Sequence, residues 1–306
     1  MPQIVFKKQL LHPRYISSWI AMVFWWLSVQ LLPFPIQIYL GRQLGRVLYK
    51  KNIRRVRIAR KNIELCFPEL QKKEVEELTR RTLESTTIGI FESGCAWFLP
   101  RWRLKPRCTI SGLEHLNNLG SQGAIFMGIH FTPIEIGAAF VNLEKGIAGF
   151  YRPHTNPVYE YIQAAGRIRH NENSQVIPNG DVRGIIKVLR KGGIVNYAPD
   201  QDYGHRRSIF APFFNIDTAT VKAPAQLARA GKAEVIPWTT KRLDDFGNYE
   251  VKIHPPITSK LSDSEENNAK LINHFIEQQI RKNPEQYLWV HKRFKTRPEG
   301  QLDIYN

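Results

Sequence analysis

The sequence predicts an α/β fold in which helices cover a mixed sheet. Apolar runs of strand length lie at residues 123–129, 146–151, 193–198 and 233–238. Segments with helical patterns separate these runs, as expected for a sheet with helical cover. The 306 residues leave room for one large domain with a substantial core. Binding sites in such folds gather where strands end.

An apolar segment precedes the predicted sheet. Residues 15–41 contain no acidic or basic side chain, and this length suffices to enter a bilayer. Pro33 and Pro35 interrupt the segment, so whether residues 16–32 span a membrane or lie in its interface stays open. Aromatic residues suited to an interface are Trp19, Trp25 and Trp26. We expect an N-terminal membrane helix that serves as a single anchor, and no cleavage site follows it to indicate a signal peptide.

A strongly basic segment with a helical pattern comes next. Its cations are Arg42, Arg46, Lys50, Lys51, Arg54, Arg55, Arg57, Arg60 and Lys61. Cations beside a membrane segment bind anionic head groups at roughly 1 kcal/mol each, and such segments lie on the cytoplasmic side. The net charge of +17 requires an anionic partner. A membrane suits this position better than nucleic acid, because no nucleic-acid recognition motif follows.

Residues 72–98 show helical periodicity and are expected to form a pair of helices packed on the core. Their apolar side is made by Val75, Leu78, Leu83, Ile88 and Phe91. The chain then divides into a membrane anchor at 1–41, a basic and amphipathic helical region at 42–106, and an α/β catalytic region at 107–306. Helices in the last region are expected at 133–141, 156–167, 181–191, 219–230 and 264–281.

The number and spacing of the cysteines favour free thiols over disulfides or a metal site. Cys66, Cys95 and Cys108 are odd in number and lack the spacing of a Cys/His metal site. Free thiols in a reducing compartment are the expected state. No metal or other cofactor is expected.

The stretch "IFMGIHFTPIE", residues 125–135, places a histidine where a predicted strand ends. Pro133 is favoured at the first position of a helix, so His130 lies at a strand-to-helix junction. Glu135, in the first helical turn, is then expected to reach one imidazole nitrogen, fix the tautomer and leave the other nitrogen as a base. The alternative is a core histidine whose hydrogen bonds are satisfied by a nearby acid.

Other predicted strand ends carry polar clusters. They contribute Asp200, Asp202 and Tyr203 from one loop, Arg152, His154 and Asn156 from another, and Arg167 and Arg169 from the end of a helix. We expect Asp200 to orient Arg167, leaving its guanidinium group for a phosphate or carboxylate. Solvated loops or structural ion pairs are the alternative. Glycine-rich phosphate loops and the Gly-x-Ser-x-Gly motif of esterases are absent from the sequence.

Taken together, the motifs resemble the late acyltransferases of lipid A biosynthesis, in particular the lauroyl or palmitoleoyl transferase branch. The resemblance covers nearly the whole chain. It is carried by "LHPRY" at 11–15, "ARKNIELCFPE" at 59–69, "ESGCAWF" at 92–98, "MGIHFTPIE" at 127–135, "YRPHTNP" at 151–157, "GRIR" at 166–169, "YAPDQDYG" at 197–204, "FAPFF" at 210–214 and "PEQYLWVHKRFKTRPEG" at 284–300.

The resemblance implies a glycerophosphate-acyltransferase-like fold and transfer of a fatty acyl chain from acyl carrier protein to a hydroxyacyl chain of Kdo2-lipid IVA. It implies the cytoplasmic face of a bacterial inner membrane. It also implies that His130 and Glu135 form the catalytic dyad and that Arg167 and Asp200 belong to the active site. Arg152 and Arg169 are further candidates for acceptor contacts.

The resemblance favours a medium-length donor, around lauroyl. Palmitoleoyl or myristoyl transfer to the same acceptor is one alternative. Acylation or hydrolysis of another membrane lipid is the other.

Overall fold

The computed structural model describes residues 4–305 of the chain. The main helices are α1 (Ile16–Leu31), α2 (Phe34–Lys50), α3 (Arg54–Cys66), α4 (Lys72–Phe98), α5 (Arg101–Leu104), α6 (Glu114–Asn117), α7 (Ile134–Glu144), α8 (Pro157–Ile168), α9 (Val182–Arg190), α10 (Ala223–Gly231) and α11 (Glu265–Lys282). The strands are β1 (Cys108–Ser111), β2 (Ala124–Met127), β3 (Ala148–Tyr151), β4 (Gln175–Pro178), β5 (Ile194–Tyr197), β6 (Ser208–Phe213), β7 (Ile216–Val221), β8 (Glu234–Arg242) and β9 (Tyr249–Ile253).

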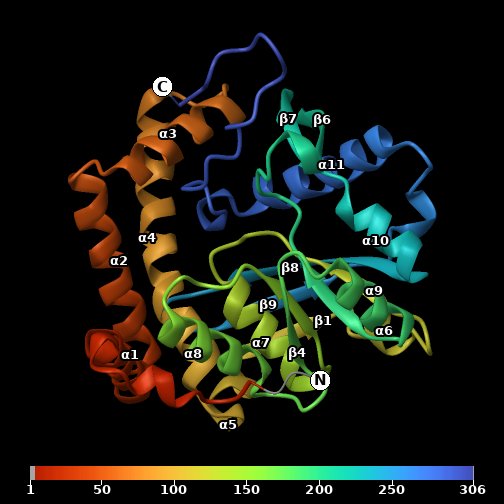
Figure 1. Cartoon of the computed structure of the whole chain (residues 1–306). Helices are drawn as coiled ribbons and strands as arrows, with labels where there is room; N and C mark the ends of the chain where they lie inside the picture. Colours follow the sequence, from red (N-terminus) through yellow and green to blue (C-terminus); the bar gives the residue numbers. More distant parts are fainter. Residues whose placement is uncertain (1–3, 306) are drawn as a thin grey trace.

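Seven of these strands form a mixed sheet in the order β1-β9-β8-β2-β5-β3-β4. β8 and β9 pair antiparallel, and the other neighbours in this sheet pair parallel. β6 and β7 form a separate antiparallel pair. Helices cover the sheet, as Figure 1 shows, so the prediction of a mixed sheet with helical cover is confirmed. The four predicted strands correspond to β2, β3, β5 and β8.

The prediction of an N-terminal membrane helix is wrong. Within residues 4–305, no helix combines the length and the apolar character that crossing a bilayer requires. The backbone is extended at Leu32 and Pro33, so the apolar run is divided between α1 and α2. α1 has 16 residues, and the second half of α2 carries Arg42, Arg46 and Lys50.

Two other expectations also differ from the structure. Residues 72–98 form one continuous helix, α4, instead of a pair. α4 continues through Gly89 and Gly94, where a Cβ atom would lie 3.1 Å from the Thr132 carbonyl oxygen and 2.6 Å from Trp25 Nε1. The helix expected at 219–230 begins only at Ala223, because the residues before it complete β7. The β-branched residues Thr218, Thr220 and Val221 of β7 pair with β6 and are buried.

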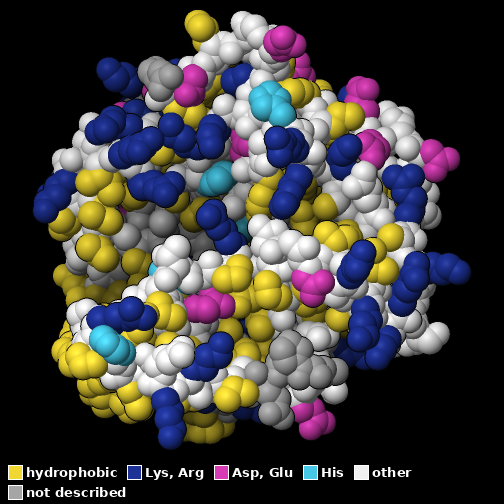
Figure 2. All heavy atoms as spheres, in the orientation of Figure 1, with side chains coloured by type: hydrophobic (Ala, Val, Ile, Leu, Met, Phe, Trp, Pro, Cys, Tyr) yellow, Lys and Arg dark blue, Asp and Glu magenta, His cyan; other side chains and the backbone are white. Residues whose placement is uncertain are grey.

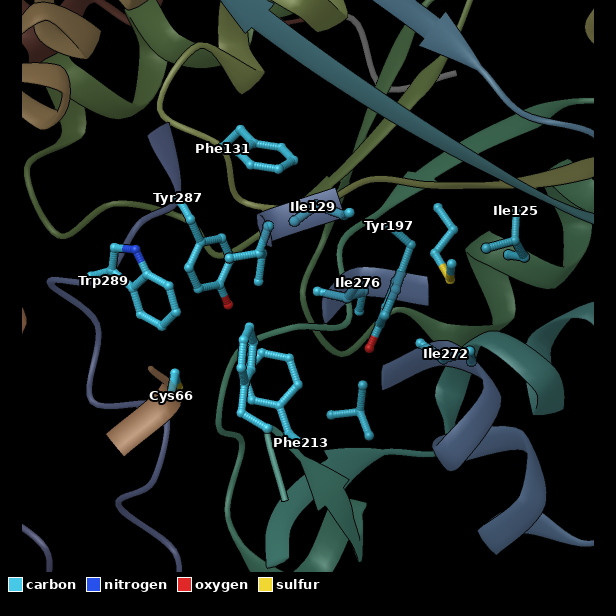
Figure 3. Close-up of a cluster of buried hydrophobic side chains, with 14 of the residues drawn as sticks. Cys66, Ile125, Ile129, Phe131, Tyr197, Phe213, Ile272, Ile276, Tyr287 and Trp289 are labelled. Atoms are coloured by element: carbon cyan, nitrogen blue, oxygen red, sulfur yellow. The ribbon is translucent and has the colours of Figure 1, made fainter. Parts of the chain in front are cut away.

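The core has two parts, one on each face of the sheet. Ile125 and Met127 point into the part that includes α3, α9 and α11, whereas Ala124 and Phe126 point into the part that includes α4 and α7. This alternation follows from the two-residue period of a strand. Figure 3 shows part of the first cluster, in which Cys66 of α3 lies near Trp289 and Tyr287. The helical region before residue 107 therefore shares its core with the sheet.

Candidate functional site

The loop after β2 carries His130, and backbone hydrogen bonds to residues 286–288 hold this loop in place. Pro133 is the residue before α7, so the strand ends and the helix begins within a few residues. The His130 carbonyl accepts a hydrogen bond of 3.0 Å from the Leu288 amide, and the Thr132 amide donates to the Gln286 carbonyl at 2.7 Å. The segment 286–288 therefore fixes the loop from the far end of the chain.

The imidazole of His130 is paired with Asp200. His130 Nδ1 lies 2.6 Å from Asp200 Oδ1, and the His130 amide donates to Asp200 Oδ2 at 2.9 Å. Asp200 follows β5, which is the parallel neighbour of β2, so the ends of adjacent strands bring the two residues together. No hydrogen bond to His130 Nε2 is found from any residue between 4 and 305. Asp200 therefore orients the ring and leaves Nε2 open.

Glu135 pairs with Arg167 instead. Arg167 Nε donates to Glu135 Oε2 at 3.1 Å, and Arg167 Nη2 donates to Glu135 Oε1. Trp97 Nε1 donates to the same Oε2 atom at 3.1 Å. The expected pairings, Glu135 with His130 and Asp200 with Arg167, are both wrong, because the first turn of α7 faces the end of α8 while the imidazole faces β5. The four side chains nevertheless lie in one site.

Charge and burial act against each other on these groups. Burial lowers the pKa of His130, but the Asp200 carboxylate outweighs it, so the pKa of His130 lies above its ordinary value. Burial raises the pKa of Asp200, and the pairing with His130 reverses this and holds it below its ordinary value. The pKa of Glu135 is likewise lowered, since Arg167 outweighs burial. Both carboxylates are therefore ionised at neutral pH.

His130 and Glu135 lie between two hollows in the protein. The inner cavity, of about 150 Å³, extends between α7, α8 and the sheet, and its walls include Ala138, Ala139 and Asn142 of α7. The outer cleft, of about 510 Å³, opens between α1 and α4, where Met22, Trp25 and Ile90 line it. Both hollows are lined by His130, Ile134 and Glu135. A substrate in either one reaches the same imidazole.

The remaining predicted polar residues do not all join the site. Arg152 is exposed and lines neither hollow, and Arg169 donates to the Trp97 carbonyl at 2.7 Å. Asp202 lines neither hollow, and its carboxylate accepts hydrogen bonds from the amide and the hydroxyl of Thr296. Tyr203 lines the inner cavity. Asn156 accepts from two amides at the start of α8 and is thus a helix cap.

A buried polar network behind the His130 loop was missed at the sequence level. Arg242 Nη2 donates to Ser85 Oγ at 2.7 Å, and Ser85 Oγ lies 2.7 Å from the Thr132 hydroxyl. The Gln286 side chain accepts a hydrogen bond from the Arg242 amide and donates one to the Arg242 carbonyl. The backbone carbonyl of Gln286 accepts a hydrogen bond from the Thr132 amide. Glu92 Oε1 lies 3.5 Å from Arg242 Nη1. Because partners lie up to 157 residues apart, no local pattern signals this network.

Replacing Arg242 with methionine should lower the free energy of unfolding by about 3–5 kcal/mol, because it removes both the cation beside Glu92, whose pKa burial already raises, and the donor to Ser85. Denaturant unfolding in a fixed detergent measures this change. Lys241→Met is the control, since that side chain is partly exposed and its ion pair contributes little. The double variant Arg242→Met and Glu92→Leu should recover much of the loss. A double variant no more stable than the single one would contradict this account of the pair.

Among residues 4–305, no three His, Cys, Asp or Glu side chains are grouped as they would be to hold a metal ion. Cys66 and Cys95 are buried, and burial raises the pKa of both thiols. His130, with its ring oriented by the Asp200 carboxylate, is arranged for proton transfer.

Comparison with known proteins identifies relatives over the full chain. Residues 3–296 match the family described as bacterial lipid A biosynthesis acyltransferase. The chain is 39% identical to a lipid A biosynthesis lauroyltransferase of Escherichia coli (strain K12) over 298 residues, covering 96% of each chain. It is 38% identical to the palmitoleoyltransferase of the same organism, covering 99% of each chain. Identity to the myristoyltransferase is 28%, over 98% of this chain and 93% of the relative.

Proposed function

The chain belongs to the bacterial lipid A biosynthesis acyltransferase family and is an acyltransferase, for which we propose a donor, an acceptor and a role for each site residue. The donor is a fatty acyl thioester of acyl carrier protein. The acceptor is the hydroxyl of a 3-hydroxyacyl chain on Kdo2-lipid IVA. The observation that carries the proposal is the position of the Asp200-paired His130 between the inner cavity and the more open outer cleft.

In this mechanism His130 Nε2 removes the proton of the acceptor hydroxyl while the hydroxyl oxygen attacks the thioester carbonyl. Asp200 holds the proton of Nδ1 and stabilises the imidazolium that forms, as the carboxylate does in a Ser-His-Asp triad. The carbon–sulfur bond then breaks, the ester forms, and the imidazolium returns its proton to the departing thiolate. Glu135 fixes Arg167, whose Nη1 remains for an oxygen atom of the substrate.

The outer cleft suits an acceptor that arrives from a membrane. Large apolar side chains are exposed along α1 and α2, namely Ile16, Ile20, Val23, Phe24, Trp26, Leu27, Leu31, Ile36, Tyr39, Leu40, Leu44 and Val47. Figure 2 shows apolar side chains gathered along the left edge, over α1 and α2 in Figure 1. Such a surface fits the boundary between head groups and acyl chains. We place it against the cytoplasmic face of the inner membrane, as the resemblance implies.

Part of the basic segment is occupied within the protein. Arg42 pairs with Asp245, Arg46 with Glu84, and Arg60 with Glu76. Cations that remain exposed, without an ion pair to the described residues, are Lys50, Lys51, Arg54, Arg55, Arg57 and Lys61. These six are the ones proposed to meet anionic head groups.

We assign the inner cavity to part of the acyl tail of the donor. Glu135, Ala138, Ala139 and Asn142 follow one another along one side of α7, and Asn142 lies roughly 10 Å beyond Glu135 at 1.5 Å per residue. Asn142 donates to the Arg167 carbonyl at 2.7 Å and accepts from the Ile147 amide and from Ser174. With three hydrogen bonds holding it in place, the Asn142 side chain closes the end of the inner cavity that lies away from Glu135. The cavity therefore limits the length of the tail.

Replacing Ala139 with leucine should shift the donor preference to chains at least two carbons shorter, because each methylene excluded from the cavity is worth about 0.8 kcal/mol. Turnover with a series of acyl carrier protein donors measures the preference. Ala165→Leu on α8 is the control, because Ala165 does not line the cavity. An unchanged preference in Ala139→Leu would place the tail elsewhere.

The proposed reaction is tested by mass spectrometry of the product made by purified enzyme from a mixed pool of acyl carrier protein donors. We expect one medium-length chain, around lauroyl, on Kdo2-lipid IVA. Free fatty acid released in step with thioester loss, without acylated lipid, would indicate a hydrolase. Acylation of a glycerol phosphate in place of the lipid A precursor would contradict the proposed acceptor.

A further inference from the structure

A third hollow adjoins the inner cavity on the side away from α1. It has a volume of about 460 Å³ and lies between α9 and α10. Its apolar walls are made chiefly by Val182, Ile185, Ile186, Ala223, Leu227 and Ala230. We call it the α9–α10 pocket. The mechanism proposed above does not use it.

The α9–α10 pocket and the inner cavity have a common wall. Phe150, Tyr197 and Tyr203 line both. The rings of Phe150 and Tyr197 are stacked with their centroids 5.4 Å apart, and Tyr203 is 40% exposed. The α9–α10 pocket therefore begins directly beyond the wall of the cavity at His130, and Tyr203 is the exposed side chain of that wall.

The mouth of the pocket carries positive charge only. Arg206, Arg207 and Lys222 line it, and neither aspartate nor glutamate does. Lys222 pairs with Glu265 at 3.0 Å, and Arg207 donates a long hydrogen bond of 3.4 Å to the Asn179 side chain. Arg206 is exposed and makes no ion pair with any residue from 4 to 305. The two arginines therefore have donors available for an anion.

The position of the pocket separates it from the membrane-facing surface. Figure 1 shows α1 and α2 at one side of the molecule and α9 and α10 at the other, with the sheet between them. The outer cleft opens on the α1 side. A lipid acceptor and a carrier-bound donor can thus approach His130 from opposite sides without competing for one entrance.

We propose that the α9–α10 pocket binds the phosphopantetheine arm of the thioester donor, with the apolar walls along the pantetheine chain and Arg206 and Arg207 on its phosphate. This assignment rests on the proposed function, which supplies the carrier-bound thioester. An arm of this kind joins an apolar chain to an anionic phosphodiester, and the pocket joins apolar walls to a cationic mouth. Arginine provides the paired donors that phosphate oxygens accept.

The test compares two small donors that carry the same acyl chain, acyl-4′-phosphopantetheine and acyl-pantetheine. Wild-type enzyme should prefer the phosphorylated donor. Replacing both Arg206 and Arg207 with glutamine should lower kcat/KM for that donor by about 10- to 100-fold, as expected for loss of charge-assisted hydrogen bonds. The value for acyl-pantetheine and the KM for the acceptor should stay within about twofold.

The matched control removes the same amount of charge nearby. Lys187→Gln with Lys191→Gln alters two exposed cations at α9 that do not line the pocket. This control should retain the preference for the phosphorylated donor. A wild type without that preference, an equal loss in the control, or an increase confined to the acceptor KM would each overturn the proposal. The last result would assign the cations to phosphates of the acceptor.

Direct binding separates this inference from the proposed reaction. If wild-type enzyme transfers no acyl group from any thioester, the proposed donor is wrong. Titration with 4′-phosphopantetheine alone then decides on the pocket. Saturable binding that is lost in the double arginine variant and kept in the lysine control would support the pocket, and equal binding by all three proteins would overturn it.

Discussion

Replacing His130 with alanine is expected to lower the turnover number by about 10²- to 10⁴-fold, the usual contribution of a general base. The loss arises because His130 is the one histidine among residues 4–305 that lines both hollows, and Glu135, which lines both as well, is bound to Arg167. Initial rates with purified enzyme, saturating donor and saturating acceptor measure the effect. The KM values should change far less, because the imidazole accepts a proton in the transition state and contributes little to binding of either substrate.

The control for this variant is His154→Ala. His154 is exposed, and its imidazole packs on Tyr159 without lining either hollow. The unfolding midpoint of His130→Ala must match that of wild type for the comparison to hold. Near wild-type turnover by a folded His130→Ala protein would refute its role as the base.

Replacing Asp200 with asparagine is expected to lower turnover by about 10²- to 10⁴-fold and to move the pH dependence. The base must be unprotonated, so the rate in wild type rises with pH as His130 loses its proton, at a pKa above its ordinary value. Without the carboxylate, burial dominates and the pKa of His130 falls. The rising part of the curve of rate against pH therefore moves to lower pH, and the maximal rate at high pH falls. Rates measured across the pH range report both effects.

Glu135→Gln is the comparison variant for Asp200→Asn. Asp200 raises the pKa of His130 more than Glu135 does. The rising part of the rate–pH curve should therefore move less in Glu135→Gln than in Asp200→Asn. Glutamine also weakens the attachment of Arg167, so some loss of rate is expected. A larger shift of this rising part in Glu135→Gln than in Asp200→Asn would show that the carboxylate facing the imidazole in solution is Glu135.

The residues at the site could be selected from the sequence, but their pairing could not. His130, Glu135, Arg167 and Asp200 were chosen because polar side chains follow predicted strands or end a helix, and all four lie in one site. The spacing from His130 to Glu135 suggested the wrong partner. The correct partner depends on β5 lying beside β2, and no local pattern reports the order of strands in a sheet.

Local chemistry in the sequence determined the α/β class, four strands of the main sheet, five helices of the catalytic region apart from the start of α10, and the family of the chain. Apolar runs and turn residues act over a few neighbours, so they can be read in order along the chain. Local signals placed an interruption at Pro33 but did not establish that the apolar N-terminal run forms two helices without a membrane span, and they did not reveal that short β-branched segments form β6 and β7. Element boundaries of this kind depend on partners elsewhere.

Tertiary structure alone decided which acid orients His130, how Arg242 holds the loop beside it, and which hollows meet at the imidazole. Each of these features joins residues from separate elements. A buried charge or hydrogen-bonding group is satisfied by whatever partner packing brings within about 3 Å. That partner is set by strand order and helix packing across the whole chain, and the spacing of residues within one segment carries no information about it.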